Sequence, residues 1–354
     1  TLDRLTGEVV FTSSPPGAQL LIDGQSRGNT DQTLDLEARP HEIEIRHDGY
    51  LPFRTTLTPE PGLTQAVRAS LKQEGPAGLA QTITSPQDAK LVLVGPGRFT
   101  MGASRREPGR RANEVLREIE ITRPFYLAVN EVSNKEFREF NPQHLSGGYG
   151  GENLEIDHHP DVNVTWENAA RYFNWLSQKA GLPPVYIERN GSLVARTPMP
   201  HGYRLPTEAE WAWAARFPDA TSAQKYAWGN SLPVPLDAGN YGDQSGSRIL
   251  DSTLPTYRDG HPATAPVGSF RANALGLYNL GGNVSEWVQD IYAFTPTAPG
   301  SVEQDPTGPA TGPHHVIRGA SWMDTSLTEI RLTFRDYGDG ARPDVGFRIA
   351  RSAQ

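Results

Sequence analysis

Two carboxylates near the end of the chain, Asp324 and Glu329, have the residue types and spacing best suited to chemistry. Such a pair can serve as general acid and base, or bind a hard or non-haem metal ion. The simpler interpretation is that both groups are solvated or paired with nearby guanidinium groups, for which Arg331 and Arg335 are the candidates. We favour the simpler interpretation.

Two pairs of adjacent histidines, His158-His159 and His314-His315, are the other candidates for a mixed histidine and carboxylate metal site. Neighbouring residues in a strand point to opposite faces, so one such pair does not readily chelate one metal ion. We therefore expect structural or surface roles for all four histidines.

An asparagine and a glutamate, Asn279 and Glu286, enclose a glycine-rich stretch that suits a calcium ion. They offer two side-chain oxygens with backbone carbonyls between them, and calcium takes six to eight oxygen ligands in flexible loops. The alternative is that the asparagine only forms a turn. We favour structural calcium, which would stabilise the fold and take no part in catalysis.

The composition excludes several classes of protein. The chain contains no cysteine, which rules out disulfides, thiolate metal sites and cysteine nucleophiles. The net charge of −8 disfavours nucleic acid and anionic membranes as main partners, because both require a basic surface. No apolar stretch is long enough to span a membrane. The chain begins at Thr1, and we expect a signal or anchoring segment to have been removed before it.

The first part of the chain has the pattern of a small β domain, for which we take residues 1–72. Short apolar or β-branched runs alternate with turns, and the Asp23-Gly24 pair is typical of a tight hairpin turn. The run His41–Arg46 alternates isoleucine with polar residues, as a half-buried strand does. Residues 73–89 are rich in proline and glycine and lack apolar periodicity, which predicts a linker.

Residues 90–354 form the second predicted domain, in which isolated helices alternate with long irregular segments. Ser133, Thr165 and Thr207 each stand before a helical pattern, and the first and third belong to capping boxes that end in Glu136 and Glu210. The fold class predicted for the whole chain is therefore α+β, with a small β-sandwich followed by a loop-rich domain.

Short motifs connect both domains with known families. The stretches Ser14-Pro15-Pro16-Gly17-Ala18, Ile22-Asp23-Gly24 and His47-Asp48-Gly49-Tyr50 resemble the PEGA domain, with Pro16 in place of the glutamate of its name. Six ordered motifs of the second domain are similar to the formylglycine-generating enzyme (sulfatase-modifying factor) family, whose fold is a variant of the C-type lectin. These six motifs are Gly97–Gly102, Asn163–Ala169, Tyr203–Trp211, Gly282–Trp287, Arg318–Trp322 and Gly346–Arg348.

The resemblance also implies site residues. Oxidases of the family use two cysteines to bind copper, and this chain has Asp324 and Glu329 at those positions, so we expect no copper and no formylglycine-generating activity. The family's calcium ligands carry over to two sets of residues: Asn279, Gly282, Val284 and Glu286 for the first ion, and Asn240, Tyr241, Asp259 and His261 for the second. The family's peptide groove carries over to Ser321, Trp322, Asp324 and Glu329, with Trp322 expected as an exposed aromatic anchor.

Three functions remain open from the sequence. The favoured one is a non-catalytic, calcium-stabilised scaffold or sensor that binds a protein or peptide at the bacterial envelope, in the periplasm or at the cell surface, in a signalling or secretion system. The second is a cysteine-independent, metal-dependent oxidase, like a family relative in siderophore maturation. It would use Asp324 and Glu329, together with His314 or His315. The third is a C-type-lectin-like receptor for a glycan or another ligand.

Overall fold

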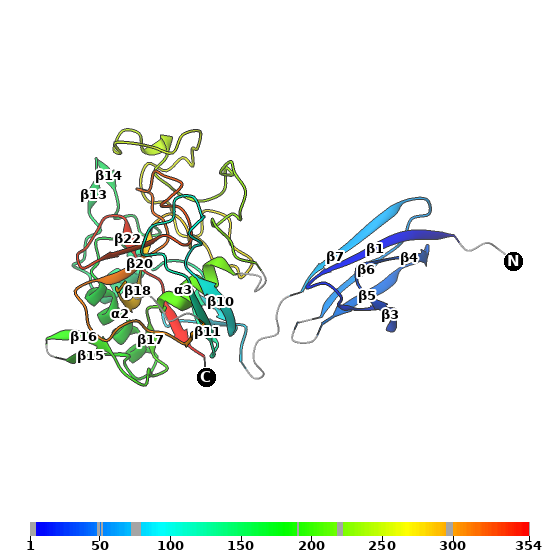
Figure 1. Ribbon diagram of the computed structural model, residues 1–354, viewed down its shortest axis with the longest axis horizontal. Helices are drawn as coiled ribbons and strands as arrows, with labels where there is room; N and C mark the ends of the chain where they lie inside the picture. The colour runs from blue at the N-terminus through cyan, green and yellow to red at the C-terminus, as the bar shows by residue number, and fades with distance from the viewer. Residues whose placement is uncertain are drawn as a thin grey trace. The chain divides into compact units, whose positions relative to one another are not determined.

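The computed structural model describes residues 5–47, 50, 52–71, 79–189, 191–217, 222–294 and 300–353. The chain divides into two compact units, Thr1–Leu79 and Ala80–Gln354 (Figure 1). Each unit has its own hydrophobic core. The α+β fold class predicted from the sequence is confirmed, with few helices and a β-rich first unit.

The first unit consists of two antiparallel or mixed sheets that share one core. The strands are β1 (Thr6–Ser14), β2 (Gln19–Ile22), β3 (Gln25–Asn29), β4 (Gln32–Glu37), β5 (His41–Arg46), β6 (Phe53–Leu57) and β7 (Thr64–Ser70). Their orders are β4-β1-β7 and β3-β2-β5-β6. Phe11 of the first sheet and Ile45 of the second belong to the same buried cluster, so the two sheets form a sandwich.

Local sequence signals explain most of this unit. Asp23 and Gly24 have φ angles of 51° and 76°, the left-handed values that the predicted hairpin turn requires. Ile43 and Ile45 are buried while their neighbours are more exposed, as their alternation predicts. The strands β1 and β7 pair in parallel, with register from Glu8↔Thr64 to Ser14↔Ser70. Asp48 and Gly49 of the last PEGA-like stretch lie outside the described residues.

The described residues of the second unit form three larger sheets and two small ribbons. The sheet orders are β17-β23-β12-β9-β8, β10-β11-β19 and β21-β20-β18-β22, and the ribbons are β13-β14 and β15-β16. The strands are β8 (Thr82–Thr84), β9 (Lys90–Val94), β10 (Gly97–Met101), β11 (Arg117–Ile121), β12 (Phe125–Ala128), β13 (Gly148–Tyr149), β14 (Glu152–Asn153), β15 (Tyr186–Arg189), β16 (Ser192–Ala195), β17 (Tyr203–Arg204), β18 (Ser285–Ile291), β19 (Val302–Gln304), β20 (His315–Arg318), β21 (Arg335–Gly338), β22 (Val345–Gly346) and β23 (Ala350–Ser352).

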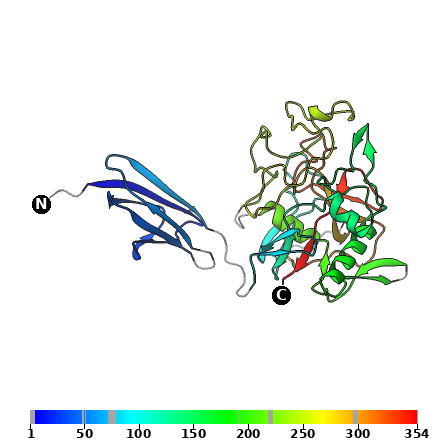
Figure 2. The same ribbon diagram turned by 180° about the vertical axis from the view of Figure 1, so that it is seen from behind.

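The helices begin where the sequence predicts. They are α1 (Asn134–Phe140), α2 (Trp166–Lys179) and α3 (Glu208–Arg216), with a short 3₁₀ helix at Gln244–Gly246. Ser133, Thr165 and Thr207 are their N-caps, and the two predicted capping boxes are present. In Figure 2, α2 lies on the near side of the strands. All nine residues of α3 are buried, so this helix is packed on every side, and Ala209 and Trp211 to Ala215 belong to the main core cluster.

The predicted linker is wrong in its second half. Thr82–Thr84 form β8, which pairs with β9 at the edge of the five-stranded sheet. Ser85 stabilises the following turn, where its hydroxyl accepts hydrogen bonds from the backbone N–H groups of Gln87 and Ala89. The edge strand is only three residues long, and so short a segment carries too little periodicity to be recognised. Residues 73–78 of the predicted linker lie outside the described residues.

Candidate functional site

The two candidate carboxylates, Asp324 and Glu329, lie in one irregular segment between β20 and β21. Asp324 closes a tight turn, because its Oδ2 accepts hydrogen bonds from the backbone N–H (2.7 Å) and the hydroxyl (3.1 Å) of Ser321. Glu329 accepts a hydrogen bond from the Ser326 hydroxyl at 2.8 Å. Both side chains therefore hold the local backbone in place.

The electrostatics of the two carboxylates differ. Burial raises the pKa of Asp324 to about 7, and the nearby negative charges of Asp344 and Glu329 add to the effect. Glu329 pairs with Arg111 at 3.7 Å across a partly exposed surface. The partners expected from the sequence are wrong: Arg331 binds Glu107 and Glu114, and Arg335 binds Glu208. The acidic partners of Arg331 and Arg335 are distant in the sequence, so the local spacing of residues does not predict these ion pairs.

The aromatic anchor expected at Trp322 is also wrong. Trp322 is fully buried, its Nε1 donates to the Pro343 carbonyl at 3.2 Å, and its ring packs edge-on against Tyr149. Ser321 is buried as well. Of the four residues predicted for the groove, Asp324 and Glu329 are partly exposed, and the carboxyl group of Asp324 is itself buried. Aromatic residues are large and apolar, so such a motif position is more readily explained by core packing than by binding.

In the first predicted calcium set, the side-chain oxygen of Asn279 has no hydrogen-bond partner, whereas the carboxylate of Glu286 is already paired with an arginine. Asn279 is buried with a φ of 58°, and its Oδ1 has no hydrogen-bond partner. The carboxylate of Glu286 binds the guanidinium of Arg348, with Nε at 2.9 Å from Oε1 and 2.8 Å from Oε2, and accepts from Trp211 Nε1 at 2.8 Å. The orphaned amide oxygen fits a cation, whereas the neighbouring guanidinium already neutralises the glutamate.

Glu131 is a buried carboxylate beside this set that sequence analysis missed. It accepts hydrogen bonds from the side-chain amides of Asn279 (3.2 Å) and Asn283 (3.0 Å). Burial raises its pKa to about 7, while Arg348 lowers it and Glu286 raises it. The only signal in the sequence is an acidic residue between the valines Val129 and Val132. Glu131 therefore places a second carboxylate beside the first predicted calcium set.

The second predicted calcium set is brought together by the fold. The carboxylate of Asp259 accepts the backbone N–H groups of Tyr241 (3.0 Å) and His261 (2.8 Å). Burial raises the pKa of Asp259 to about 7, with Asp243 contributing. Asn240 is fully buried, and its Oδ1 has no hydrogen-bond partner. A buried oxygen without a donor and a carboxylate that is costly to ionise both fit a calcium ion better than an empty turn.

The two side chains of each histidine pair have different surroundings, although His158 and His159 lie in a turn and only His315 of the second pair lies in a strand. His315 stacks on Trp166 with a centroid separation of 3.8 Å, and burial lowers its pKa to about 4, whereas His314 packs near Tyr337. His159 is buried against Thr264, while His158 is exposed. Within the described ranges, no group of three or more His, Asp or Glu side chains is arranged to hold a metal ion.

Two family models match the chain. The sulfatase-modifying factor enzyme 1-like domain matches residues 76–353, and the PEGA domain matches residues 6–75. Both resemblances predicted from the sequence motifs are confirmed.

Three curated relatives illustrate the range of similar proteins. A formylglycine-generating enzyme of Streptomyces coelicolor is 34% identical over 207 residues, which is 55% of this chain and 53% of that protein. This chain thus spans only about half of that relative's length. The inactive C-alpha-formylglycine-generating enzyme 2 of Mus musculus is 31% identical over 303 residues, with 75% and 87% covered. The chaperone protein LppX of Paenibacillus barcinonensis is 28% identical over 245 residues, with 64% and 80% covered.

Two solved structures share the fold. Treponema denticola variable protein 1 superposes with a TM-score of 0.58 at 24% identity, covering 77% of this chain and 98% of that one. PvdO from Pseudomonas aeruginosa gives a TM-score of 0.54 at 26% identity, with the same shares covered.

Proposed function

The chain belongs to the sulfatase-modifying factor enzyme 1-like family and carries a PEGA domain before it, and we propose that it is a non-catalytic binding scaffold of that family. The main support for this proposal is the burial and hydrogen bonding of Asp324. At the position of a family cysteine, its carboxylate is buried and its Oδ2 is engaged by Ser321. A carboxylate is a hard ligand that does not replace a thiolate toward Cu(I), and this one serves a turn.

A protein or peptide is the partner that best suits this scaffold. One similar protein is named inactive and another is named a chaperone, so members of this family include proteins described by roles other than catalysis. Because Trp322 is buried, the aromatic anchor must lie elsewhere. Leu327 is 42% exposed and lies between Asp324 and Glu329 in the sequence, and it offers apolar surface at the position of the family's groove.

Calcium is proposed as a structural ion of this domain. Asn279, the carbonyls of Gly282 and Val284, and Glu286 would hold one ion, with Glu131 as an additional donor. Asn240, Asp259 and the carbonyls of Tyr241 and His261 would hold the other. The support is that the two asparagines of these sets both have buried Oδ1 atoms without hydrogen-bond partners. An ion bound only by the folded state would add stability that grows with the logarithm of its free concentration above the dissociation constant.

We place the protein at the bacterial envelope, in the periplasm or at the cell surface. The support is the PEGA domain, which the resemblance associates with envelope proteins. Among the described residues, no helix is both long and apolar enough to cross a membrane.

The first experiment measures the metal content of the untagged, chelator-free protein by mass spectrometry. We expect calcium at one or two equivalents. The same protein is incubated with copper, oxygen and a cysteine-containing peptide, and we expect no change in the mass of the peptide. Stoichiometric iron or copper, or an oxygen-dependent mass change, would contradict the scaffold and favour the cysteine-independent oxidase, for which the likeness to PvdO is the support.

The second experiment tests the binding surface with photo-crosslinkers. One probe replaces Leu327, and a control probe replaces Leu145, which is 70% exposed in the same unit. We expect an envelope protein to be captured at position 327 and not at position 145. Equal capture at both positions, or none at either, would argue against a binding surface at this segment.

A further inference from the structure

An arginine-rich loop lies between β10 and β11 of the second unit. Residues 103–114, which we call the arginine loop, contain Arg105, Arg106, Arg110 and Arg111 together with two glutamates. Three of the four arginines are exposed, and Arg110 is partly exposed. On a chain with a net charge of −8, this loop forms a local basic surface.

A buried arginine binds both glutamates of the arginine loop. Arg331 is 1% exposed, and its guanidinium donates hydrogen bonds to Glu107 at 2.9 Å and to Glu114 at 2.7 and 2.6 Å. It also donates to the carbonyl of Gly109 at 2.6 Å, so one side chain fixes the loop at three points. Because both acidic side chains are turned toward Arg331, the outer face of the loop remains positively charged.

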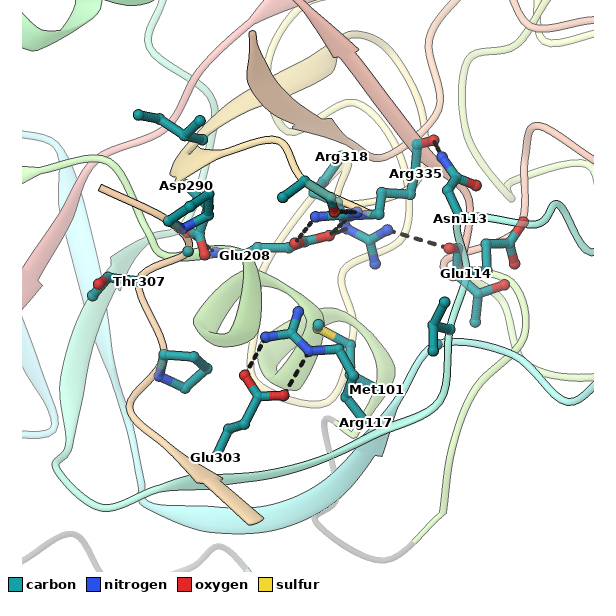
Figure 3. Close-up of a pocket in the computed structure, with 18 residues that line it drawn as sticks. Met101, Asn113, Glu114, Arg117, Glu208, Asp290, Glu303, Thr307, Arg318 and Arg335 are labelled. Atoms are coloured by element: carbon teal, nitrogen blue, oxygen red, sulfur yellow. Dashed lines mark hydrogen bonds and ion pairs between the residues drawn. The ribbon is translucent and has the colours of Figure 1, made fainter. Parts of the chain in front are cut away.

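The outer arginines of the loop differ from the arginines of the interior in their partners. In the cavity of Figure 3, which Glu114 helps to line, Arg117 binds Glu303 through two hydrogen bonds. Among the described residues, the guanidinium groups of Arg105 and Arg106 have no hydrogen bond and no ion pair. These two adjacent guanidinium groups are therefore available to an anionic group from outside the chain.

The arginine loop packs against the segment for which we propose partner binding. Gly109 has a φ of 83°, and a Cβ at this position would lie 2.7 Å from Thr328 Oγ1, so the loop backbone closely approaches the residue after Leu327. Arg111 lies 3.7 Å from Glu329 of the same segment. The basic surface therefore adjoins the exposed side chain of Leu327.

The chemistry of this combined surface suits an acidic peptide segment. A guanidinium binds a carboxylate through two parallel hydrogen bonds. Leu327 is 42% exposed and offers apolar contact, which a free phosphate or sulfate ion cannot use. A broad anionic surface such as a membrane would also meet Glu329 and the negative charge of the chain as a whole. A short acidic segment avoids this repulsion, because it lies within the basic surface.

We propose that the arginine loop binds an acidic segment of the protein or peptide partner. Carboxylates of that segment pair with Arg105 and Arg106, and a neighbouring apolar side chain packs against Leu327. This inference rests on the proposed binding function and specifies the chemistry of the partner. Because the arginines are exposed, their attraction to the partner weakens as the salt concentration rises.

The test selects binders of the full chain from a displayed library of random short peptides. The strongest binder is synthesised and titrated against the parent protein and two double variants. Arg105→Glu with Arg106→Glu reverses the two unpaired charges of the loop. The matched control, Arg171→Glu with Arg189→Glu, makes the same change of net charge at exposed arginines of α2 and β15.

We expect the selected peptides to be enriched in Asp and Glu. The loop variant should bind the strongest peptide at least about tenfold more weakly, because one exposed ion pair accounts for up to about fivefold in affinity and charge reversal adds repulsion. The control variant should bind within about twofold of the parent, since its changes lie outside the loop and are screened by salt. The same peptide with Asn and Gln in place of its Asp and Glu should lose the dependence on the loop.

Three outcomes would overturn the proposal, and they differ in what they mean for the scaffold. Selected peptides without acidic enrichment, crosslinked by the probe at position 327, would keep the binding function and exclude the arginine loop from it. Acidic peptides that bind the parent and the loop variant equally would place the acidic segment elsewhere. The absence of any selected peptide would count against both proposals, and binding of phosphatidylglycerol vesicles by the parent but not by the loop variant would then assign the loop to a membrane surface.

Discussion

Replacing Glu286 by alanine distinguishes two roles of this glutamate. One is the ion pair with Arg348, and the other is the proposed binding of calcium. Arg348 is fully buried, and its guanidinium binds Glu286 and the carbonyls of Ala128 (3.0 Å) and Tyr278 (2.9 Å). Without Glu286, the arginine keeps its carbonyl partners but loses its hydrogen-bonded counter-ion, and the nearby Glu131 acts on it only through the longer-range charge interaction. Removing one member of such a pair typically costs about 3–5 kcal/mol, mostly because the remaining charge is uncompensated.

The measurement is urea unfolding in excess chelator, followed by tryptophan fluorescence. All seven tryptophans lie between residues 166 and 322, so the signal reports only the second unit. At an m value of about 3 kcal/mol/M, the expected loss lowers the unfolding midpoint by about 1–2 M. The matched control is Glu329→Ala, whose pair with Arg111 is partly exposed and should contribute less than about 1 kcal/mol.

A double variant completes this prediction. Glu286→Leu combined with Arg348→Met removes both charges, so it should be more stable than Glu286→Ala, because no unpaired charge remains. If Glu286→Ala instead costs less than about 1 kcal/mol in chelator and more only when calcium is added, the pair with Arg348 is unimportant and the glutamate acts through calcium alone. That result would refute the reasoning.

Three further predictions follow from the site and the core. Asp324→Asn should remove a stability loss that occurs as pH rises from about 4 to 7. The folded-state pKa of about 7 lies above the unfolded value, so between these two values the folded state binds one more proton than the unfolded state. Urea unfolding midpoints of the parent and the variant at several pH values test this. Midpoints that change with pH in the same way for both proteins would contradict it. Trp322→Ala should lower the free energy of unfolding by about 3–5 kcal/mol, because the ring is fully buried. A loss below about 1 kcal/mol would indicate instead that the ring is exposed, as expected from the sequence. Gly97→Ala should cost about 1–3 kcal/mol by the same assay, since its Cβ would lie 2.1 Å from Trp213; an unchanged midpoint would show that the indole moves aside.

Features that depend on a few neighbouring residues could be predicted from the sequence. The caps at Ser133, Thr165 and Thr207, the turn at Asp23-Gly24 and the strand at His41–Arg46 are all local patterns, and the structure contains each of them. The family motifs were also recognisable, because several short stretches in the correct order carry more information than any one of them.

Features that depend on contacts between distant residues could not be predicted. The pair of Arg331 with Glu114 joins residues separated by 217 positions, and the pair of Arg335 with Glu208 joins residues separated by 127. The burial of Trp322 depends on Tyr149 from a separate ribbon. Nothing in the spacing of the last hundred residues specifies these partners, and so the local salt bridges expected there were wrong.

The parallel pairing of β1 with β7 gives the first unit a mechanical property. Parallel first and last strands mean that the chain enters this unit at one end and leaves it at the other. A pull applied between residues 6 and 70 therefore loads the pairs from Glu8↔Thr64 to Ser14↔Ser70 in shear, so that many backbone hydrogen bonds resist at once instead of opening one after another. A domain with this connection transmits tension along its length as a stiff link and keeps its fold under loads that would open a hairpin strand by strand.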